Sequence, residues 1–380
     1  MSGMATLVRI AGRLGAGLVL ASVLAGCAGA EKAKPTELGP NTALIGVRQV
    51  WSASVGSSVA FPLDVRAVGD QVLVASSSGT LVAMDSKTGV DIWRAQLETP
   101  LAAGVGSDGR FVAVVSRENE LIVVNGGKEL WRQRLQAVTL TTPLVAGARV
   151  FTLSGDRTVA AFDAANGRKL WQQARAGEPL VLGQAGLLYA VGDTLVVGQG
   201  GRLVGMNPLN GSVRWEVPVA NSRGTNEVER LVDLVAGVSR VGDVSCVRAF
   251  QSTVACVNTS RATVLWSKPA NGSSGLHGDD SLLVGAESDG KVIAWKRSDG
   301  ERSWVSERLR FRGLATPLLL GRSIVVGDET GLLHFLSRED GSPLNRLPTD
   351  GSAIIGEPAL AGQTLIVVTR RGGVFGFRPD

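Results

Sequence analysis

A recurring phrase that ends in tryptophan constrains the fold of this chain more than any other feature. Six tryptophans recur at intervals of 38 to 51 residues, and each ends a stretch made of an apolar strand, a turn and a second strand. The fullest copies are GTLVAMDSKTGVDIW (79–93) and DRTVAAFDAANGRKLW (156–171). A period near 40 with several short strands is typical of propeller blades. We therefore expect one ring of repeats. The six residues are Trp93, Trp131, Trp171, Trp215, Trp266 and Trp304.

The repeats number eight if the last one is split between the two ends of the chain. A seventh copy (331–347) ends in Leu rather than Trp, and an eighth begins at 372–380 without its Trp strand. The missing strand is VRQVWSASV (47–55), which has a Trp and no preceding strand. Pairing these two pieces would close the ring and remove its free edges. The sequence predicts an all-β, eight-bladed propeller of four-stranded blades, closed by the N-terminal strand.

The turn inside each phrase has a structural explanation. Asp85, Asp163 and Asn207 each begin a turn with a side chain that can accept a backbone hydrogen bond two residues on, and a glycine ends the turn. This glycine tolerates a positive φ. The repeated Trp is best explained as a wedge that packs between adjacent blades.

The N-terminus predicts an export signal. Arg9 and Arg13 precede an apolar run (14–26) that is too short to span a membrane, so residues 1–26 are predicted to be a signal peptide. The run ends in Leu-Ala-Gly-Cys, which resembles the bacterial lipobox and makes Cys27 the expected lipidated residue. The alternative is a plain signal peptide with an incidental Cys. By analogy with lipoprotein sorting, Ala28 in place of Asp directs the chain to the outer membrane.

The domain organisation follows from these features. We expect a lipidated tether over residues 27–43 and the propeller over residues 44–380, facing the periplasm. The formal net charge of +5 is too mild and too dispersed to favour nucleic acid as a partner.

The two remaining cysteines fall on one predicted hairpin. Alignment with the first repeat places Cys246 and Cys256 opposite each other, at a separation that a disulfide can bridge. An oxidising compartment would allow the bond, while two buried free thiols are the alternative.

A search for catalytic or metal-binding groups finds only isolated residues. His277 lies in a Gly/Ser-rich loop and His334 in a strand of another repeat. The pair Asp279-Asp280 and the nearby Asp289 could hold a cation, but solvated turns explain them better. Nucleophile-elbow, HExxH, phosphate-loop and CxxC motifs are absent from the sequence. We expect no catalytic residue, no metal and no cofactor.

The repeat phrase resembles that of the pyrroloquinoline-quinone propeller dehydrogenases, which have eight blades. An enzyme of that family would need a Ca²⁺ site and, in many members, an adjacent Cys pair over the cofactor. The chain has no Cys-Cys. A quinoprotein-type redox enzyme is therefore the alternative function.

A second resemblance covers the whole chain, to the lipoprotein propellers of the bacterial β-barrel assembly machinery. Besides the lipobox and the split repeat, it rests on NEVERLVDLVAGV (226–238) and VVGDETGLLHFLSREDG (325–341). The resemblance implies a non-catalytic role: holding the periplasmic repeats of the barrel-inserting subunit and helping unfolded outer-membrane proteins reach it.

The same resemblance implies which residues contact the barrel-inserting subunit. The family's L-x-L-R loop falls on Leu180 and Leu182, and its R-L-x-D-x-D loop on Arg230 and Asp233. Two charged family positions are replaced, by Gly183 and by Val235. These four matched residues are expected to form one exposed patch, because connections between blades lie on the same face. The alternative is that Leu180 and Leu182 are ordinary strand residues.

Overall fold

The computed structural model describes residues 33–60, 62, 64–175, 183–220 and 232–380. Contacts divide the chain into two units, Met1–Pro35 and Thr36–Asp380, and the second contains every described strand. No helix among these described residues is long and apolar enough to cross a membrane.

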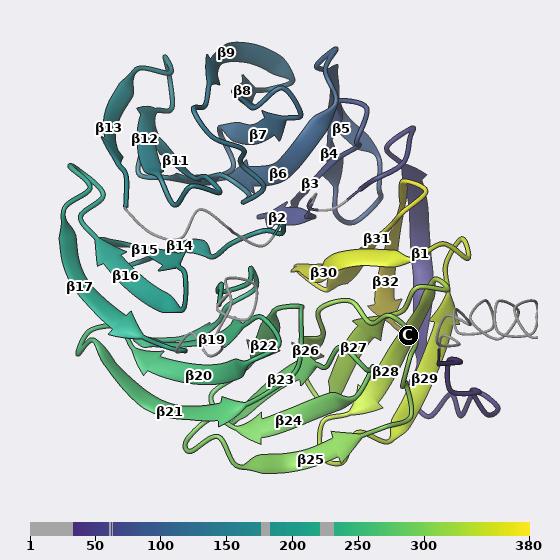
Figure 1. Cartoon of the computed structure of the whole chain (residues 1–380). Coiled ribbons are helices and arrows are strands. Elements are labelled where there is room, and N and C mark those ends of the chain that lie inside the picture. The colour runs from purple at the N-terminus through teal and green to yellow at the C-terminus, as the bar shows by residue number, and fades with distance from the viewer. Residues whose placement is uncertain (1–32, 61, 63, 176–182, 221–231) are drawn as a thin grey trace, which may run out of the picture. The chain divides into compact units, whose positions relative to one another are not determined.

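The unit Thr36–Asp380 is a ring of eight antiparallel four-stranded sheets, which confirms the predicted fold class (Figure 1). Blade 1 is β2 (Arg66–Val68), β3 (Gln71–Ala75), β4 (Thr80–Asp85) and β5 (Asp91–Gln96); blade 2 is β6 (Leu101–Ser107), β7 (Val112–Ser116), β8 (Glu120–Asn125) and β9 (Lys128–Arg134); blade 3 is β10 (Leu144–Ala146), β11 (Arg149–Leu153), β12 (Val159–Asp163) and β13 (Lys169–Gln173); blade 4 is β14 (Leu188–Val191), β15 (Thr194–Gln199), β16 (Arg202–Met206) and β17 (Val213–Pro218).

The second half of the ring repeats this order. Blade 5 is β18 (Ser239–Val241), β19 (Val244–Ala249), β20 (Thr253–Asn258) and β21 (Thr263–Pro269); blade 6 is β22 (Leu276–Gly278), β23 (Leu282–Ala286), β24 (Val292–Lys296) and β25 (Arg302–Ser306); blade 7 is β26 (Leu318–Leu320), β27 (Ser323–Gly327), β28 (Leu332–Ser337) and β29 (Pro343–Pro348); blade 8 is β30 (Ile354–Ala361), β31 (Thr364–Thr369), β32 (Gly373–Pro379) and β1 (Val47–Ser54).

Blade 8 closes the ring in the predicted way. Its outer strand β1 pairs antiparallel with β32, from Val47 opposite Pro379 to Ser54 opposite Gly373. The amide of Val55 extends this ladder by donating to the carbonyl of Gly372 at 2.9 Å. The two ends of the propeller therefore share one sheet, and neither presents an unpaired edge at the junction.

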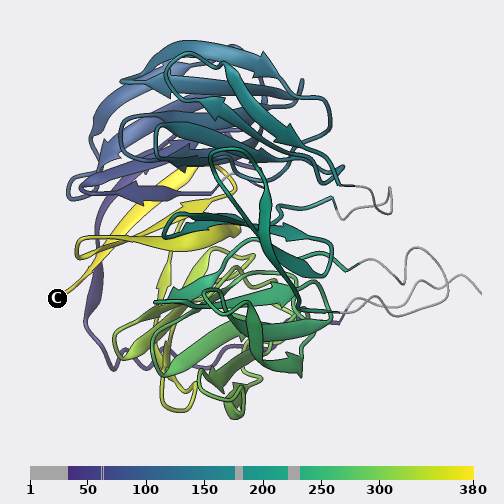
Figure 2. The ribbon, with the colours of Figure 1, turned by 90° about the vertical axis from the view of Figure 1, so that its left-hand side faces the viewer.

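Antiparallel order gives the ring two different faces. Turns between the second and third strands, such as residues 154–158, share one face with the connections from blade to blade; we call this the connection face. Turns between the third and fourth strands, such as residues 163–167, lie on the opposite face, which we call the turn face. The C-terminus follows a third strand and so lies on the turn face, as the edge-on view shows (Figure 2).

The repeated tryptophan joins five of the described blades to the next blade by a hydrogen bond. In blade 2 the Trp131 indole Nε1 donates to the carbonyl of Ala164, in the turn of blade 3, at 2.9 Å. Its ring packs on Gly167, where an added Cβ would lie 2.6 Å from Trp131 Cδ2. The same indole-to-turn hydrogen bond is made by Trp51, Trp171, Trp266 and Trp304. The period found in the sequence is therefore the period of this interblade contact.

One repeat departs from the pattern and offers a controlled comparison. Gly167 has φ +75° under the Trp131 ring, while Ala262 takes the equivalent place in blade 5 with φ 53°. We predict that Gly167→Ala lowers the free energy of unfolding by at least about 2 kcal/mol, from left-handed strain and contact with the ring. Ala262→Gly should change it by less than about 1 kcal/mol, because relief of strain offsets the added chain entropy. Chemical denaturation measures both, and equal effects of the two substitutions would refute this role for the glycine.

The stretch before β1 lies along the outer edge of blade 7. The carbonyl of Thr36 accepts a hydrogen bond from Arg312, the Asn41 amide group donates to the carbonyl of Arg346, and the Leu44 amide donates to the carbonyl of Leu344 at 2.7 Å. Of the stretch 27–43 that the sequence assigns to a tether, residues from Thr36 onward thus contact the propeller. They cover part of the edge of β29.

Ring closure can be tested by deletion. Removing residues 45–55 deletes β1 and leaves the outer side of β32 unpaired, so we predict aggregation of the purified soluble form. Size-exclusion chromatography with light scattering measures this. A deletion variant that stays monomeric and melts at the temperature of the parent would show that the closure is dispensable.

Candidate partner-binding face and central channel

The centre of the ring is a cavity of about 580 Å³ lined by residues from all eight blades or their connections. Among the described residues, Asp64 and Glu357 are the two carboxyl groups that line it. Burial raises the pKa of Asp64 to about 6. Burial, together with the negative charge of Asp64, raises the pKa of Glu357 to about 8. Sequence reasoning missed both, because a single acidic residue in a connection (Asp64) or in a strand (Glu357 in β30) carries no repeat or spacing signal.

These raised pKa values predict a pH dependence of stability. The folded-state pKa values of Asp64 and Glu357 lie above those of the same groups in the unfolded chain. Their contribution to the free energy of unfolding is therefore fully present below about pH 4, and it is lost as the pH rises through about 6 for Asp64 and about 8 for Glu357. Glu357→Gln removes the second titration. We predict that the variant melts at the wild-type temperature at pH 5 and at a higher temperature at pH 9.

Differential scanning fluorimetry across this range checks the prediction, with the exposed Glu339→Gln as a matched control. Parallel melting curves for wild type and Glu357→Gln from pH 5 to 9 would contradict the assignment.

The two histidines occupy separate structural sites. His277 Nδ1 accepts the amide of Leu319 at 3.1 Å, which ties β22 of blade 6 to β26 of blade 7. His334 Nε2 lies 2.9 Å from a carboxylate oxygen of Asp328, which also pairs with Arg312 Nε at 2.8 Å. Burial opposes ionisation of Asp328, but hydrogen bonds led by that from His334 hold its pKa well below the usual range. Both histidines are thus engaged in packing between and within blades.

The acidic residues considered for a cation lie at opposite ends of blade 6. Asp279 is in the turn after β22, where hydrogen bonds from the Leu282 and Ser281 amides and from Arg338 outweigh burial and lower its pKa to about 2. Asp289 is in the turn between β23 and β24 and pairs with Lys291 and Arg310. Within the part of the chain that the structure describes, no group of three or more His, Cys, Asp or Glu could hold a metal ion.

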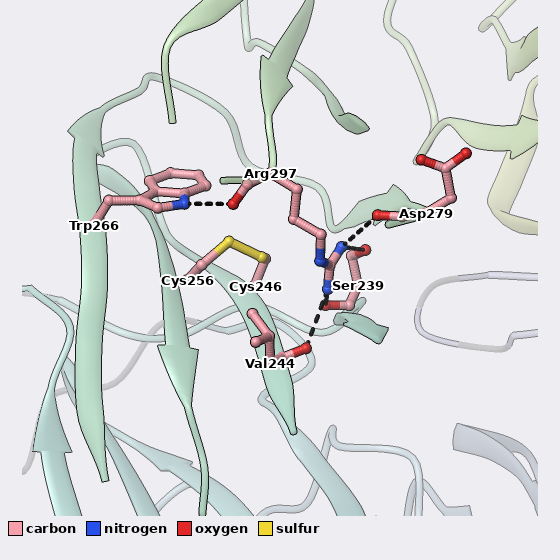
Figure 3. Close-up of a disulfide and its surroundings, with 7 residues drawn as sticks. All are labelled: Ser239, Val244, Cys246, Cys256, Trp266, Asp279 and Arg297. Carbon is pink, nitrogen blue, oxygen red and sulfur yellow. Dashed lines mark hydrogen bonds between the residues drawn. A yellow bond between two sulfur atoms is a disulfide. The ribbon is translucent and has the colours of Figure 1, made fainter. Parts of the chain in front are cut away.

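Cys246 and Cys256 stand opposite each other on β19 and β20, in the predicted register. The structure joins their sulfur atoms in a disulfide, with the Cα atoms 4.0 Å apart (Figure 3). Beside it, Trp266 donates to the carbonyl of Arg297, whose guanidinium returns to blade 5 and donates to the carbonyls of Ser239 and Val244. The disulfide therefore lies beside the hydrogen bonds that connect blades 5 and 6.

The four residues matched to the family's binding loops are only partly described. Leu180, Leu182 and Arg230 lie outside the described residues. Asp233 is described, is half-buried, and its carbonyl accepts the amide of Phe250 at 2.9 Å. The exposed patch of four residues consequently stays a prediction.

The described ends of both loops are joined on the connection face. Gly186 and Val235 form an antiparallel bridge, and the amide of Ala236 donates to the carbonyl of Ala185 at 3.1 Å. Val235, which replaces a family Asp, is only 2% exposed. The connection before blade 4 and the connection before blade 5 therefore start from one shared backbone junction.

Solved structures similar to this chain share the fold. The crystal structure of BamB from Moraxella catarrhalis matches with a TM-score of 0.79 at 22% identity, over 87% of this chain and 99% of that chain. A quinohemoprotein alcohol dehydrogenase from Comamonas testosteroni matches with a TM-score of 0.68 at 13% identity, over 90% of this chain and 78% of that chain. At these identities the likeness shows the propeller alone.

Sequence comparison is more specific. The profile of a family described as "Outer membrane protein assembly factor BamB" matches residues 77–306. Curated relatives of that name are 39% identical over 94% of this chain and 95% of the relative in Burkholderia pseudomallei, and 33% identical over 90% of each in Bordetella pertussis. On this evidence the chain belongs to the family of the outer membrane protein assembly factor BamB.

Proposed function

We infer that this chain is a non-catalytic scaffold subunit in outer-membrane protein assembly. It binds the periplasmic repeats of the barrel-inserting subunit, BamA, and helps unfolded outer-membrane proteins reach that subunit. The names of its relatives support the assembly role. The connection face supports the mode of binding, because it gathers polypeptide from several blades on one rigid ring.

The observation that carries the proposal is the backbone junction between the two connections. Each carries residues matched to the family's binding loops, and the bridge between Gly186 and Val235 fixes their ends side by side. A partner that touches both connections then meets a surface already assembled, so less conformational entropy is lost on binding.

The localisation proposed is the periplasmic side of the outer membrane, anchored by lipid on Cys27. Stable anchoring needs more than one acyl chain, and the resemblance to a lipobox implies that Cys27 carries them. Cys27 lies outside the described residues. Mass spectrometry of the mature N-terminus tests this, since an unmodified chain in membrane fractions would rule out the anchor.

The alternative of a quinoprotein-type dehydrogenase is favoured by the resemblance of the repeat phrase and by the likeness of fold. The residues here fit that cofactor site poorly. The described part of the cavity lining offers two carboxyl groups, and the three cysteines of the chain are not adjacent. Reconstitution with quinone and Ca²⁺ followed by a dehydrogenase assay discriminates the two functions: turnover with a bound chromophore would favour the enzyme.

We predict that Asp233→Lys or Leu182→Glu weakens binding of the BamA periplasmic repeats by more than tenfold, which corresponds to about 1.4 kcal/mol. The reason is that a charged flank and an apolar centre together make a binding hot spot. Biolayer interferometry with the purified repeats measures the affinity, and thermal melting checks that each variant is folded.

Glu339→Lys is the matched control, because it makes the same charge change at an exposed residue of the turn face. If Asp233→Lys and Leu182→Glu bind like Glu339→Lys, or if they unfold the protein, the connection face is not the binding surface.

A further inference from the structure

A pocket opens on the connection face between blades 3 and 4, beside the junction of the two connections. Its volume is about 160 Å³, and its apolar lining includes Val138, Leu140, Leu153 and Leu234. Leu153 and Leu234 are 5% and 2% exposed and form its floor, whereas Val138 is 67% exposed at its rim. A cavity of about 150 Å³ lined by such side chains holds a benzene molecule, so this pocket admits one large apolar side chain.

One arginine at this pocket occupies a left-handed turn position that is glycine in four other blades. Arg157 ends the turn between β11 and β12 with φ 66°. The same position is glycine with positive φ in four other blades, and in blade 2 it is Asn119 with φ 64°, a residue type that tolerates this region. Left-handed backbone is strained for a residue with a Cβ, and such strain concentrates at functional positions. Arginine lacks the tolerance of Gly and Asn for this region, so the strained backbone at Arg157 needs an explanation.

The guanidinium of Arg157 has no acceptor among the described residues. Its Nε is buried without a hydrogen-bond partner, and the group lies against Gly200, where an added Cβ would be 3.8 Å from Nη2. Gln184, which also lines the pocket, has a buried Nε2 that lacks an acceptor within the same described part of the chain. Two unsatisfied donors at one apolar pocket favour a ligand that brings its own acceptor oxygens.

We propose that this pocket receives an apolar side chain of a protein partner docked on the connection face, and that Arg157 pairs with a carboxylate next to that side chain. The inference rests on the proposed function and adds a specificity-determining residue to it. The planar guanidinium fork suits a bidentate carboxylate, and the pocket supplies the anchor site that such a pair flanks.

The position of Arg157 in the repeat offers a clean variant. Arg157→Gly installs the residue found at this turn in other blades, so the protein should melt at or above the wild-type temperature. Affinity for the BamA periplasmic repeats should fall about tenfold at low salt. The difference from wild type should shrink as sodium chloride is raised, because salt screens the lost ion pair.

The matched control is Arg168→Ala, which removes an exposed arginine from the turn face of the same blade. It should bind like wild type. Arg157→Lys keeps the charge without the planar guanidinium, so its affinity should lie between those of wild type and Arg157→Gly.

The carboxylate on the partner is located by a double-mutant cycle. Each Asp or Glu on the partner's docking surface is changed to Asn or Gln and measured against wild type and Arg157→Gly. One such change should weaken binding to wild type by about tenfold and have no further effect on Arg157→Gly.

The outcomes separate this inference from the proposed function. If Arg157→Gly binds within twofold of wild type while Asp233→Lys loses binding, the pairing of Arg157 with a partner carboxylate is refuted and the proposed function stands. If Asp233→Lys, Leu182→Glu and Arg157→Gly all bind normally, the role of Arg157 and the proposed binding surface are both refuted. If Arg157→Gly weakens binding but no partner carboxylate couples to it, the ion pair is refuted.

Discussion

The contact between a tryptophan ring and a glycine turn of the next blade is the interaction on which this ring depends. A four-stranded blade cannot bury both of its faces alone, so each must pack against its neighbours. The indole contributes both a hydrogen bond and apolar packing. Its Nε1 donates to a turn carbonyl in the next blade, and its ring covers a glycine of the same turn. The last contact of the series, from Trp51 to the turn of blade 1, requires β1 to sit in blade 8. Closure of the ring by β1 and the packing of blade 8 on blade 1 therefore depend on the same strand.

That constraint also explains what could be predicted from the sequence. The blade number, the split blade and the register of Cys246 and Cys256 all follow from a local phrase repeated at a fixed period. The docking of residues 36–44 on β29 could not be predicted, since Asn41 and its partner Arg346 are 305 positions apart and belong to no repeat. The role of Arg157 was missed for a different reason. Its departure from the glycine of other blades is visible in the sequence, but the pocket that gives it meaning is assembled from segments between residues 138 and 234.

The two faces of the ring differ in what they offer a partner. On the turn face, short turns are repeated from blade to blade and engaged by the tryptophans. The connection face carries the longest links between blades, an exposed Val138 and donors without acceptors in the described chain. Such a surface suits protein recognition better than catalysis, because its polar groups are dispersed and its apolar pocket is small. The central channel, by contrast, holds two carboxyl groups whose raised pKa values reflect burial.

Hydrogen–deuterium exchange of the full-length protein, with and without the BamA periplasmic repeats, tests the central claim most directly. If the connection face binds the partner, amides of residues 138–140, 154–158, 183–186 and 232–236 should become protected in the complex, while the turns at 85–89 and 163–167 should exchange as in the free protein. Protection confined to the turn face, or equal exchange everywhere, would contradict the account.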